Sequence, residues 1–315
     1  MPRRVVKSTV LILSTNMAYA DMTWSFLCQL TKISKTFKYI VVAQDKSFYG
    51  FLQSHKIPSV SGSLMHPSSS EYAANFRSPN FNRISIAKII AVRIILELGY
   101  NVLFSDADIA WMQNPVLFLP TDVDLAIQSN TETHLFPLGH EANTGFYFLK
   151  SNNRSMALLD ETIERSKKNT NIDDQTHFAD ALRDWRKANK AVFIMEGETV
   201  PCVYNGSQPF TFRLLHPYQF QNGKAAMAFF ANKLQPPNDG KQRDVVLVHA
   251  NYMSGHNAKV NFLKSHKLWN INDTTFQRYV DEWNLKKEKY TGEQNQPRYI
   301  DYKSALKELA YVCVA

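Results

Sequence analysis

Near-continuous apolar runs alternate with segments of helical spacing along the first third of the chain. The runs Val5–Asn16 and Tyr39–Asp45 are aliphatic and end in polar residues. Between them, Asp21–Ser34 has helical spacing with Asp21 as its predicted N-cap, and Ile84–Gly99 is a second predicted helix that stops at its glycine. Strands buried on both faces read as apolar runs, so this alternation predicts an α/β fold with a mostly parallel central sheet flanked by helices.

The rest of the chain is less regular. Met65–Asn82, rich in Ser, Pro and Asn, is predicted to be a long loop beside the carboxyl ends of the strands, where such folds bind ligands. We find no internal repeat and no interdomain linker, which favours one domain with two halves. The later predicted strands are Leu125–Asn130, Asn143–Ser151, Ala191–Met195 and Val245–Ala250, and the later predicted helices are Arg154–Lys168 and Asp173–Asn189.

Composition and charge restrict the class of protein. Hydrophobic residues make up 44% of the 315 residues and charged residues 20%, which is typical of a globular protein rather than a disordered one. The net charge of +8 is spread along the chain, and the densest basic runs, Arg165–Lys168 and Leu285–Lys289, are short. A basic surface favours anionic ligands such as nucleotides, but runs of this length predict no nucleic-acid partner.

Two aspartates separated by one alanine follow an apolar strand in Val102–Pro115, VLFSDADIAWMQNP. In an extended chain Asp106 and Asp108 would point to the same side, where two close carboxylates repel each other unless a cation neutralises them. A divalent ion bridging to a phosphate meets this need, and oxygen ligands suit Mg²⁺ or Mn²⁺. A solvated turn with aspartate as a strand terminator would explain the same pair, so both interpretations stay open here.

A second polar cluster follows an apolar run in Val245–Lys259, VVLVHANYMSGHNAK. His249 comes directly after that run, as Asp106 does, and could supply an imidazole to the same metal. Gly255 would let the backbone approach a ligand closely, and Lys259 would meet diphosphate charge. The competing interpretation is a buried histidine bonded to the backbone, followed by an ordinary loop.

Four stretches, taken in order, resemble a known family. They are Lys88–Pro115, Asn143–Ser151, Asp173–Phe178 and Val248–Lys259. The set is similar to the nucleotide-diphospho-sugar transferases of glycosyltransferase family 77, a group related to the family 8 retaining transferases of GT-A fold. The resemblance implies a single GT-A type, Rossmann-like domain over about 1–270, with a nucleotide-binding half (about 1–125) and an acceptor half (about 126–270). Residues 271–315 are expected to form a C-terminal helical extension packed on it.

The resemblance also implies a metal site. Asp106, Asp108 and His249 would hold Mn²⁺, or Mg²⁺, on the diphosphate of a UDP-sugar donor, while Gly255 and Lys259 would clasp that diphosphate. The chain departs from family 8 here, because the His-x-x-Gly-x-x-Lys-Pro-Trp pattern is absent and the spacing after His249 is longer.

Further donor contacts are implied at the ends of other predicted elements. Thr15 and Asn16 close the first strand, where such enzymes bind the nucleoside, and Asp45 closes the next one. Lys88 matches a basic residue that reaches the diphosphate and donor sugar. Asn143, followed by Thr144 and Gly145, resembles a segment that contacts donor hydroxyls, although Asn and Gly also suit an ordinary turn.

The segment NIDDQTHF supplies the implied catalytic residues. Asp174 and Gln175 would lie across the sugar from the leaving group, with Lys88 on the diphosphate side. N-capping of a helix by Asp173 or Asp174 is the competing explanation, and both can hold. Two mechanisms stay open: a carboxylate attacks to form a glycosyl-enzyme, or the leaving phosphate deprotonates the acceptor on the same face.

The expected function is that of a metal-dependent retaining glycosyltransferase, moving galactose, xylose, arabinose or glucose from a UDP-sugar to a hydroxyl of a glycan or glycoprotein. A nucleotide-sugar hydrolase is a weaker alternative, because a second carboxylate cluster for a two-metal site is missing. A non-catalytic glycan-binding pseudoenzyme would be expected to have lost an aspartate or His249, and all are present. The aromatic candidates for an acceptor platform are Trp111, Tyr147, Phe212, Tyr218 and Tyr252, each of which would equally suit core packing.

The expected location is the cytoplasm. The three cysteines, Cys28, Cys202 and Cys313, form no disulfide framework, which favours a reducing compartment. The N-terminal apolar run is too short for a membrane-spanning helix, so we expect no transmembrane segment in this chain. A chain trimmed of a membrane anchor would look the same, which leaves the Golgi lumen as the alternative.

Overall fold

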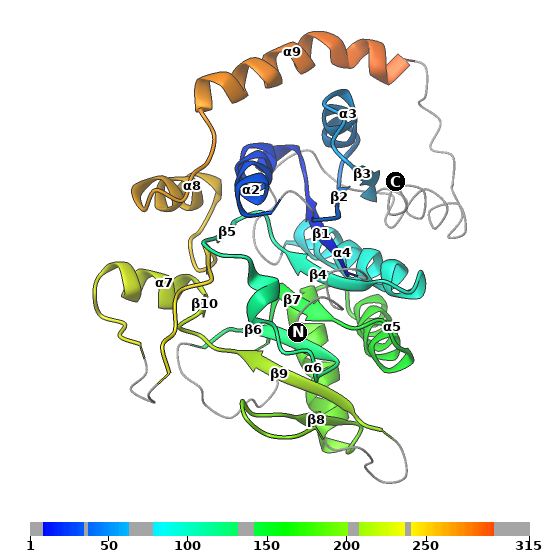
Figure 1. Ribbon diagram of the computed structural model, residues 1–315. Coiled ribbons are helices and arrows are strands. Elements are labelled where there is room, and N and C mark those ends of the chain that lie inside the picture. The colour runs from blue at the N-terminus through cyan, green and yellow to red at the C-terminus, as the bar shows by residue number, and fades with distance from the viewer. Residues whose placement is uncertain are drawn as a thin grey trace.

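A twisted eight-stranded sheet forms the centre of the computed structural model (Figure 1), which describes residues 9–34, 37–62, 78–131, 142–200, 208–236 and 241–292. The strand order is β3-β2-β1-β4-β7-β6-β9-β8. Only β7 runs antiparallel to its neighbours, so the prediction of a mostly parallel central sheet is confirmed. The strands are β1 (Thr9–Thr15), β2 (Tyr39–Ala43), β3 (Ser59–Ser61), β4 (Asn101–Ser105), β6 (Leu125–Ser129), β7 (Ala142–Leu149), β8 (Ala191–Phe193) and β9 (Phe210–Leu215).

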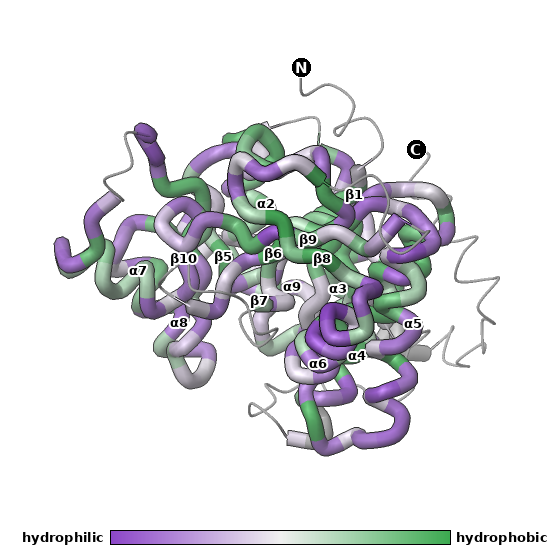
Figure 2. The backbone as a smooth tube through the Cα atoms, turned by 90° about the horizontal axis from the view of Figure 1, so that it is seen from below, coloured by the Kyte–Doolittle hydropathy of each residue, from purple (hydrophilic) through white to green (hydrophobic). Residues whose placement is uncertain are grey.

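The central strands are buried on both faces, which explains their apolar runs. Val10 and Ile12 of β1 enter one hydrophobic cluster, while Leu11 and Leu13 enter another on the opposite face. Helices α4 (Pro79–Glu97), α5 (Asn153–Lys168) and α6 (Asp174–Lys187) pack on the first cluster. Helices α2 (Ala20–Ile33) and α3 (Lys46–Ser54) pack on the second. Figure 2 shows hydrophobic residues along the strands and hydrophilic residues on the outer turns of α5 and α6.

A smaller sheet lies beside the large one and holds part of the predicted site. Its order is β10-β11-β5, where β5 spans Ile109–Trp111, β10 spans Phe220–Gln221 and β11 spans Leu247–His249. Strands β11 and β5 are antiparallel and place His249 opposite Ile109. Helices α7 (Gly223–Phe230) and α8 (His256–Ser265) cover this sheet with a third hydrophobic cluster. Short 3-10 helices occur at Met17–Tyr19 and Pro115–Phe118.

Two predicted helix starts are wrong. Helix α4 begins at Pro79 rather than Ile84, because Ser78 caps it by accepting a hydrogen bond from the Phe81 amide and proline suits the first helical position. Helix α2 begins at Ala20, and Asp21 is in its first turn rather than at its N-cap. There its negative charge interacts favourably with the helix dipole, and the N-cap is Tyr19, two positions before the predicted one. The predicted loop Met65–Asn82 is wrong at its end, because Pro79–Asn82 form the first turn of α4; residues 65–77 lie outside the described residues.

The helix α9 (Asp273–Gly292) packs across α3 at the top of Figure 1. Phe276 and Trp283 are buried against α3, and a Cβ on Gly50 would stand 2.4 Å from the Trp283 ring, so this glycine makes room for the helix. The remaining residues of the predicted extension, 293–315, lie outside the described ranges, and the division into two halves stays a prediction. Across the described residues no helix combines the length and apolar character needed to cross a bilayer.

Candidate active site

A turn between the two sheets carries the aspartate pair. Strand β4 ends at Ser105 in the large sheet and β5 begins at Ile109 in the small one, so Asp106 and Asp108 are in the connection. The Ile109 amide donates to the Asp106 carbonyl at 3.3 Å, which closes the turn. The reason given for a shared orientation was therefore wrong: a turn around Ala107, and not an extended strand, brings the two carboxylates together.

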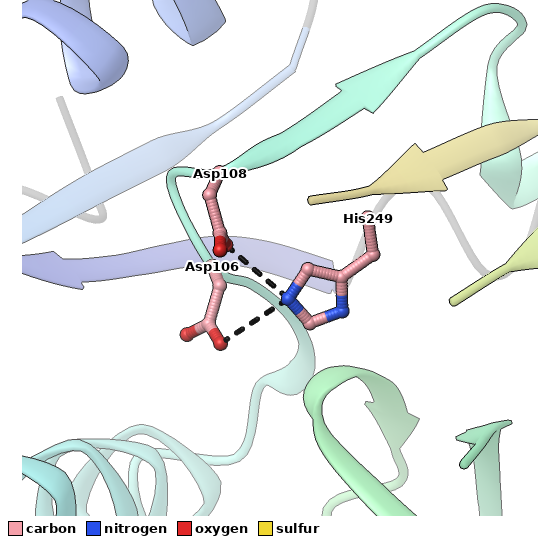
Figure 3. A group of neighbouring side chains, drawn as sticks. All are labelled: Asp106, Asp108 and His249. Carbon is pink, nitrogen blue, oxygen red and sulfur yellow. Dashed lines mark ion pairs between the residues drawn. The ribbon is translucent and has the colours of Figure 1, made fainter. Parts of the chain in front are cut away.

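His249 lies beside the two aspartates, while its role as a metal ligand stays a prediction. Its Nε2 lies 3.2 Å from Asp108 Oδ1 and 3.9 Å from Asp106 Oδ2 (Figure 3). One ligand atom from each of the three residues lies within 4.8 Å of the others. The antiparallel pairing of β11 with β5 causes this meeting, and the Ala250 amide donates to the Asp108 carbonyl at 2.9 Å. Two carboxylates and an imidazole are a donor set that suits a divalent metal ion.

The orientation of the His249 ring is fixed by Gln128, a fully buried residue of β6. Gln128 Nε2 donates to the carbonyls of Phe220 and Gln221 at 3.3 and 3.0 Å, so its Oε1 is left to accept from His249 Nδ1–H at 2.8 Å. The proton on Nδ1 leaves the Nε2 lone pair facing the aspartates, which is the tautomer that ligates a metal. Sequence reasoning missed Gln128, whose only signal was a polar residue inside the apolar run LAIQS.

Gly145 makes room for this group. The pairing of β6 with β7 shifts register next to the site, and the Gly145 carbonyl accepts from the Asp106 amide at 2.7 Å. A Cβ on Gly145 would stand 2.3 Å from His249 Cε1 and 2.7 Å from Asp106 Oδ2. Only glycine therefore fits at this position without displacing the predicted metal ligands.

Lys259 pairs with the second aspartate. Its Nζ lies 2.6 Å from Asp108 Oδ2, while Asp108 Oδ1 faces His249. Burial alone would raise the pKa of Asp108, but the Lys259 ammonium beside it holds that pKa well below its usual range. Burial would also lower the pKa of Lys259, and Asp108 instead raises it. Asp108 and Lys259 are therefore both charged at neutral pH.

Lys88 links the aspartate turn to the segment predicted to be catalytic. Its Nζ lies 3.1 Å from Asp174 Oδ2 and 3.9 Å from Asp106 Oδ1, with only 12% of the lysine side chain exposed. Burial would lower the pKa of Lys88, but Asp106 and Asp174 outweigh it and raise that pKa. The lysine is thus a fixed positive charge between two acidic residues.

Asp174 and Gln175 lie in the first turn of α6, close to Lys88. Asp173 caps this helix by accepting from the Thr176 amide at 2.9 Å. Asp174 Oδ2 accepts from the Thr144 hydroxyl at 2.9 Å, and Gln175 Oε1 accepts from the Thr144 amide at 3.3 Å. The capping interpretation therefore holds for Asp173, and the catalytic role of Asp174 and Gln175 stays a prediction.

A pocket opens at the carboxyl end of β1 and meets the aspartate turn. It includes four predicted ligand contacts beyond the aspartates, Thr15, Asn16, Lys88 and Lys259. Sequence reasoning missed Tyr19 and Ser85, which belong to no motif and reach the pocket only through the packing of helices. The lining residues are Ser14, Thr15, Asn16, Tyr19, Met22, Phe81, Ile84, Ser85, Lys88, Asp106, Ala107, Asp108 and Lys259.

Three predicted ligand contacts are not among the described residues that line this pocket: Asp45, Asn143 and Gly255. Asp45 is 2% exposed, and its two carboxylate oxygens accept from the amides of Phe48 and Met17, each at 2.7 Å. It therefore caps α3 and anchors the loop after β1. Gly255 turns the chain into α8 with a φ of +83°, and Asn143 Oδ1 accepts from the Gly145 amide at 2.8 Å.

The chain matches known proteins over much of its length. A family model described as nucleotide-diphospho-sugar transferase matches residues 35–263. The beta-arabinofuranosyltransferase RAY1 of Arabidopsis thaliana is 30% identical over 55% of this chain and 33% of its own length. The UDP-galactose:fucoside alpha-3-galactosyltransferase of Dictyostelium discoideum is 26% identical over 84% of this chain and 43% of its own. The chain therefore spans less than half the length of these two relatives.

A further relative is the UDP-D-xylose:L-fucose alpha-1,3-D-xylosyltransferase MGP4 of Arabidopsis thaliana, 24% identical over 84% of this chain and 71% of its own length. Among solved structures, the glycosyltransferase GlyE of Streptococcus pneumoniae TIGR4 is 13% identical, with a TM-score of 0.48 over 91% of this chain and 65% of that one. The family model covers well over half of the sequence, including the aspartate pair and His249. The chain belongs to the nucleotide-diphospho-sugar transferase family.

Proposed function

We propose that the protein transfers galactose, xylose, arabinose or glucose from a UDP-sugar to a hydroxyl of a glycan or glycoprotein, with a divalent metal and retention of anomeric configuration. The observation that carries the proposal is the group formed by Asp106, Asp108 and His249, with both aspartates and Lys259 on the wall of one pocket. The three relatives described above are named for arabinosyl, galactosyl and xylosyl transfer, which supports arabinose, galactose and xylose among these sugars.

Asp106, Asp108 and His249 would hold Mn²⁺ or Mg²⁺, which when bound supplies positive charge for the departing UDP. Lys259 lies on the same side and would donate to the diphosphate as its charge develops. Thr15, with its neighbours Asn16 and Tyr19, would hold the nucleoside at the carboxyl end of β1.

Asp174 would stabilise positive charge on the sugar ring. Its carboxylate is 3% exposed, pairs with Lys88 and accepts from the Thr144 hydroxyl, so it is fixed in position and its charge is partly neutralised. A carboxylate held in this way is a poor nucleophile, which supports same-face transfer with the leaving phosphate as base over a glycosyl-enzyme. Gln175 would keep the Thr144 backbone in place, and Asn143 would contact donor hydroxyls.

The acceptor that we propose to test first is an L-fucoside. The relatives from Dictyostelium discoideum and Arabidopsis thaliana that match 84% of this chain are named for a fucoside and for L-fucose as acceptors. Methyl α-L-fucoside is therefore the first acceptor probe.

A donor screen tests the proposal. The protein is incubated with each UDP-sugar, Mn²⁺ and methyl α-L-fucoside, and UDP release is measured alongside the anomeric configuration of the product by NMR. We expect release with at least one donor, and loss of release with EDTA or in Asp108→Ala. The control is Asp160→Ala, an exposed carboxylate on α5 that pairs with Arg93.

Two outcomes would overturn the proposed transfer. No UDP release with any donor, together with no UDP binding by calorimetry, would contradict the proposed transferase activity. UDP release that is equally fast with and without every acceptor tried would favour a nucleotide-sugar hydrolase instead.

A further inference from the structure

Tyr252 is the only aromatic residue among the exposed large hydrophobic residues in the described part of the chain, at 46% exposed. The structure separates it from the other aromatic candidates for an acceptor platform. Trp111, Tyr147 and Phe212 are buried in the core, and Tyr218 is half-buried with its ring packed against that of Phe229. The general preference for core packing holds for these residues but not for Tyr252.

The backbone of Tyr252 is held in an unusual conformation, with a φ of +62°. Four other described non-glycine residues have positive φ, and each directly follows the C-cap of a helix, where this conformation is ordinary. These four are Lys56, Asn189, Asn232 and Lys267. Tyr252 instead lies in the loop between β11 and α8, three residues after His249. A bulky residue in this conformation costs energy, and such residues cluster at functional sites.

Hydrogen bonds connect the Tyr252 ring to the metal-ligand group. Its hydroxyl donates to the carbonyl and the Oδ1 of Asn130, at 3.1 and 3.0 Å. Asn130 Oδ1 also accepts from Asn143 Nδ2 at 3.1 Å, and Asn143 Oδ1 accepts from the Gly145 amide at 2.8 Å. Gly145 is the residue that contacts Asp106 and makes room for His249. These hydrogen bonds therefore hold the Tyr252 ring at a fixed position relative to the metal-ligand group, while one part of the ring stays exposed to solvent.

The surroundings of the ring are polar. Lys224, an exposed lysine of α7, places Nζ 4.7 Å from the ring centroid, and Asn130 lies at the hydroxyl end. A pyranose presents a face of C–H groups edged by hydroxyls, which matches an aromatic face edged by an amide and an ammonium. Because the lysine is exposed and flexible, a sugar can displace it from the ring at small cost.

We propose that Tyr252 is the platform of an acceptor subsite, on which the apolar face of the acceptor sugar stacks while its hydroxyls bind Asn130 and Lys224. This inference rests on the proposed transfer reaction and names the surface that presents the acceptor to it. Tyr252 contacts the acceptor, and the donor pocket on the β1 side of the aspartates does not include it.

The test separates acceptor binding from donor binding. Tyr252→Ala should raise the KM for methyl α-L-fucoside about tenfold or more, while the Kd for UDP with Mn²⁺ stays within about twofold of wild type. Tyr252→Phe keeps the ring and should show a smaller increase in KM. Leu285→Ala, at an 83% exposed site on α9, is the control and should change neither value. An unchanged KM in Tyr252→Ala, or an equal loss of UDP affinity, would overturn the subsite.

Direct binding keeps this inference distinct from the proposed reaction. Saturation-transfer NMR is recorded with methyl α-L-fucoside, methyl β-D-galactoside and methyl β-D-xyloside on wild type and Tyr252→Ala, without donor. At least one glycoside should bind the wild type and lose its signal in the variant, even if no UDP release is found. Binding of none of the three to the wild type, or equal binding to both proteins, would contradict the acceptor subsite.

Discussion

Gln128 and His249, which are 121 positions apart in the chain, share a buried hydrogen bond of 2.8 Å. The amide that fixes the imidazole is itself fixed by the backbone carbonyls of Phe220 and Gln221 in β10. The orientation of the predicted metal ligand therefore depends on where β6 of the large sheet meets the small sheet, as well as on the aspartate turn.

Replacing Gln128 should weaken metal binding. Gln128→Leu removes the acceptor for His249 Nδ1–H, so we expect a loss of about 10-fold to 100-fold in Mn²⁺ affinity, measured by EPR of the free ion. Gln128→Glu keeps an acceptor and should retain more affinity. Leu158→Ala, in the core on the other face of the sheet, is the control for lost stability and should keep the affinity of wild type. Tight Mn²⁺ binding by Gln128→Leu would show that Gln128 is not needed to orient His249 for metal binding.

Adding one methyl group at Gly145 should destroy the site while leaving the fold in place. The new Cβ would clash with His249 and Asp106, so Gly145→Ala should lose Mn²⁺ binding and UDP release together. Gly197→Ala is the control, because its Cβ would meet nothing within 4 Å but its φ of +89° disfavours alanine. That variant should lose stability without losing Mn²⁺ affinity by calorimetry. Wild-type affinity in Gly145→Ala would show that the clash is relieved by movement.

Replacing Lys259 should strengthen metal binding but slow turnover. Its ammonium competes with any cation for Asp108, so Lys259→Met should bind Mn²⁺ about tenfold more tightly, equivalent to about 1.4 kcal/mol. Turnover should fall about a hundredfold or more, because the diphosphate loses a donor. Lys264→Met, on the same helix α8 but paired with Asp273, should change neither property. Weaker Mn²⁺ binding in Lys259→Met would contradict the competition.

The ion pair of Lys88 with Asp174 should contribute to stability as well as to activity. Lys88→Met leaves a buried carboxylate without its cation and should cost about 3–5 kcal/mol of unfolding free energy. Adding Asp174→Asn should recover much of that loss but none of the activity, because the unpaired charge is gone. Lys167→Met, which breaks an exposed pair with Glu164, should give no measurable change in denaturant unfolding. Equal stability of both Lys88 variants would argue against a buried-charge penalty.

The pair of His256 with Asp21 should make stability depend on pH. The hydrogen bond that His256 Nε2–H donates to Asp21 Oδ1, at 2.8 Å, raises the pKa of His256 above its ordinary value. A raised pKa in the folded state means that the stabilisation is fully present below about pH 6.5 and is lost as pH rises through the folded pKa. Asp21→Asn should therefore lower the Tm at pH 5.5 more than at pH 8.5.

The size of this pH effect should be modest. Both side chains reach solvent, so we expect less than about 1 kcal/mol by calorimetry. Asp273→Asn, whose partner is a lysine, is the control and should lower the Tm equally at the two pH values. A uniform effect of Asp21→Asn across this range would show that His256 does not titrate there.

The positions of the strand ends were predictable from the sequence, but the roles of the polar residues that follow them were only partly predictable. Asp45 and Asp106 each follow an apolar strand, yet Asp45 caps α3 and Asp106 lies at the pocket. The difference depends on the next element: helix α3 begins at Lys46, and its Phe48 amide, three residues after Asp45, donates to the Asp45 carboxylate. This spacing was visible in the sequence and points to a cap.

Other features depend on pairing between distant segments, which a local pattern does not encode. The apolar runs predicted β4 and β11, but not the turn at Ala107 that sends the chain into a second sheet, nor the register that sets His249 opposite Ile109. Gln128 and Tyr19 reach the site in the same way. Lys88, on the helix before the aspartate strand, was assigned to the site from the family resemblance and not from a local pattern.

The reversed direction of β7 determines which of its residues lie at the site. Because β7 runs against β4, its beginning rather than its end lies beside Asp106, and Asn143–Gly145 arrive there first. A fragment ending near residue 125 would keep both aspartates. It would lack His249, the Gln128 amide that orients the His249 ring, and Gly145, which makes room for that ring. The site therefore needs residues from both stretches of the chain, and a fragment that contains only one of them lacks a complete site.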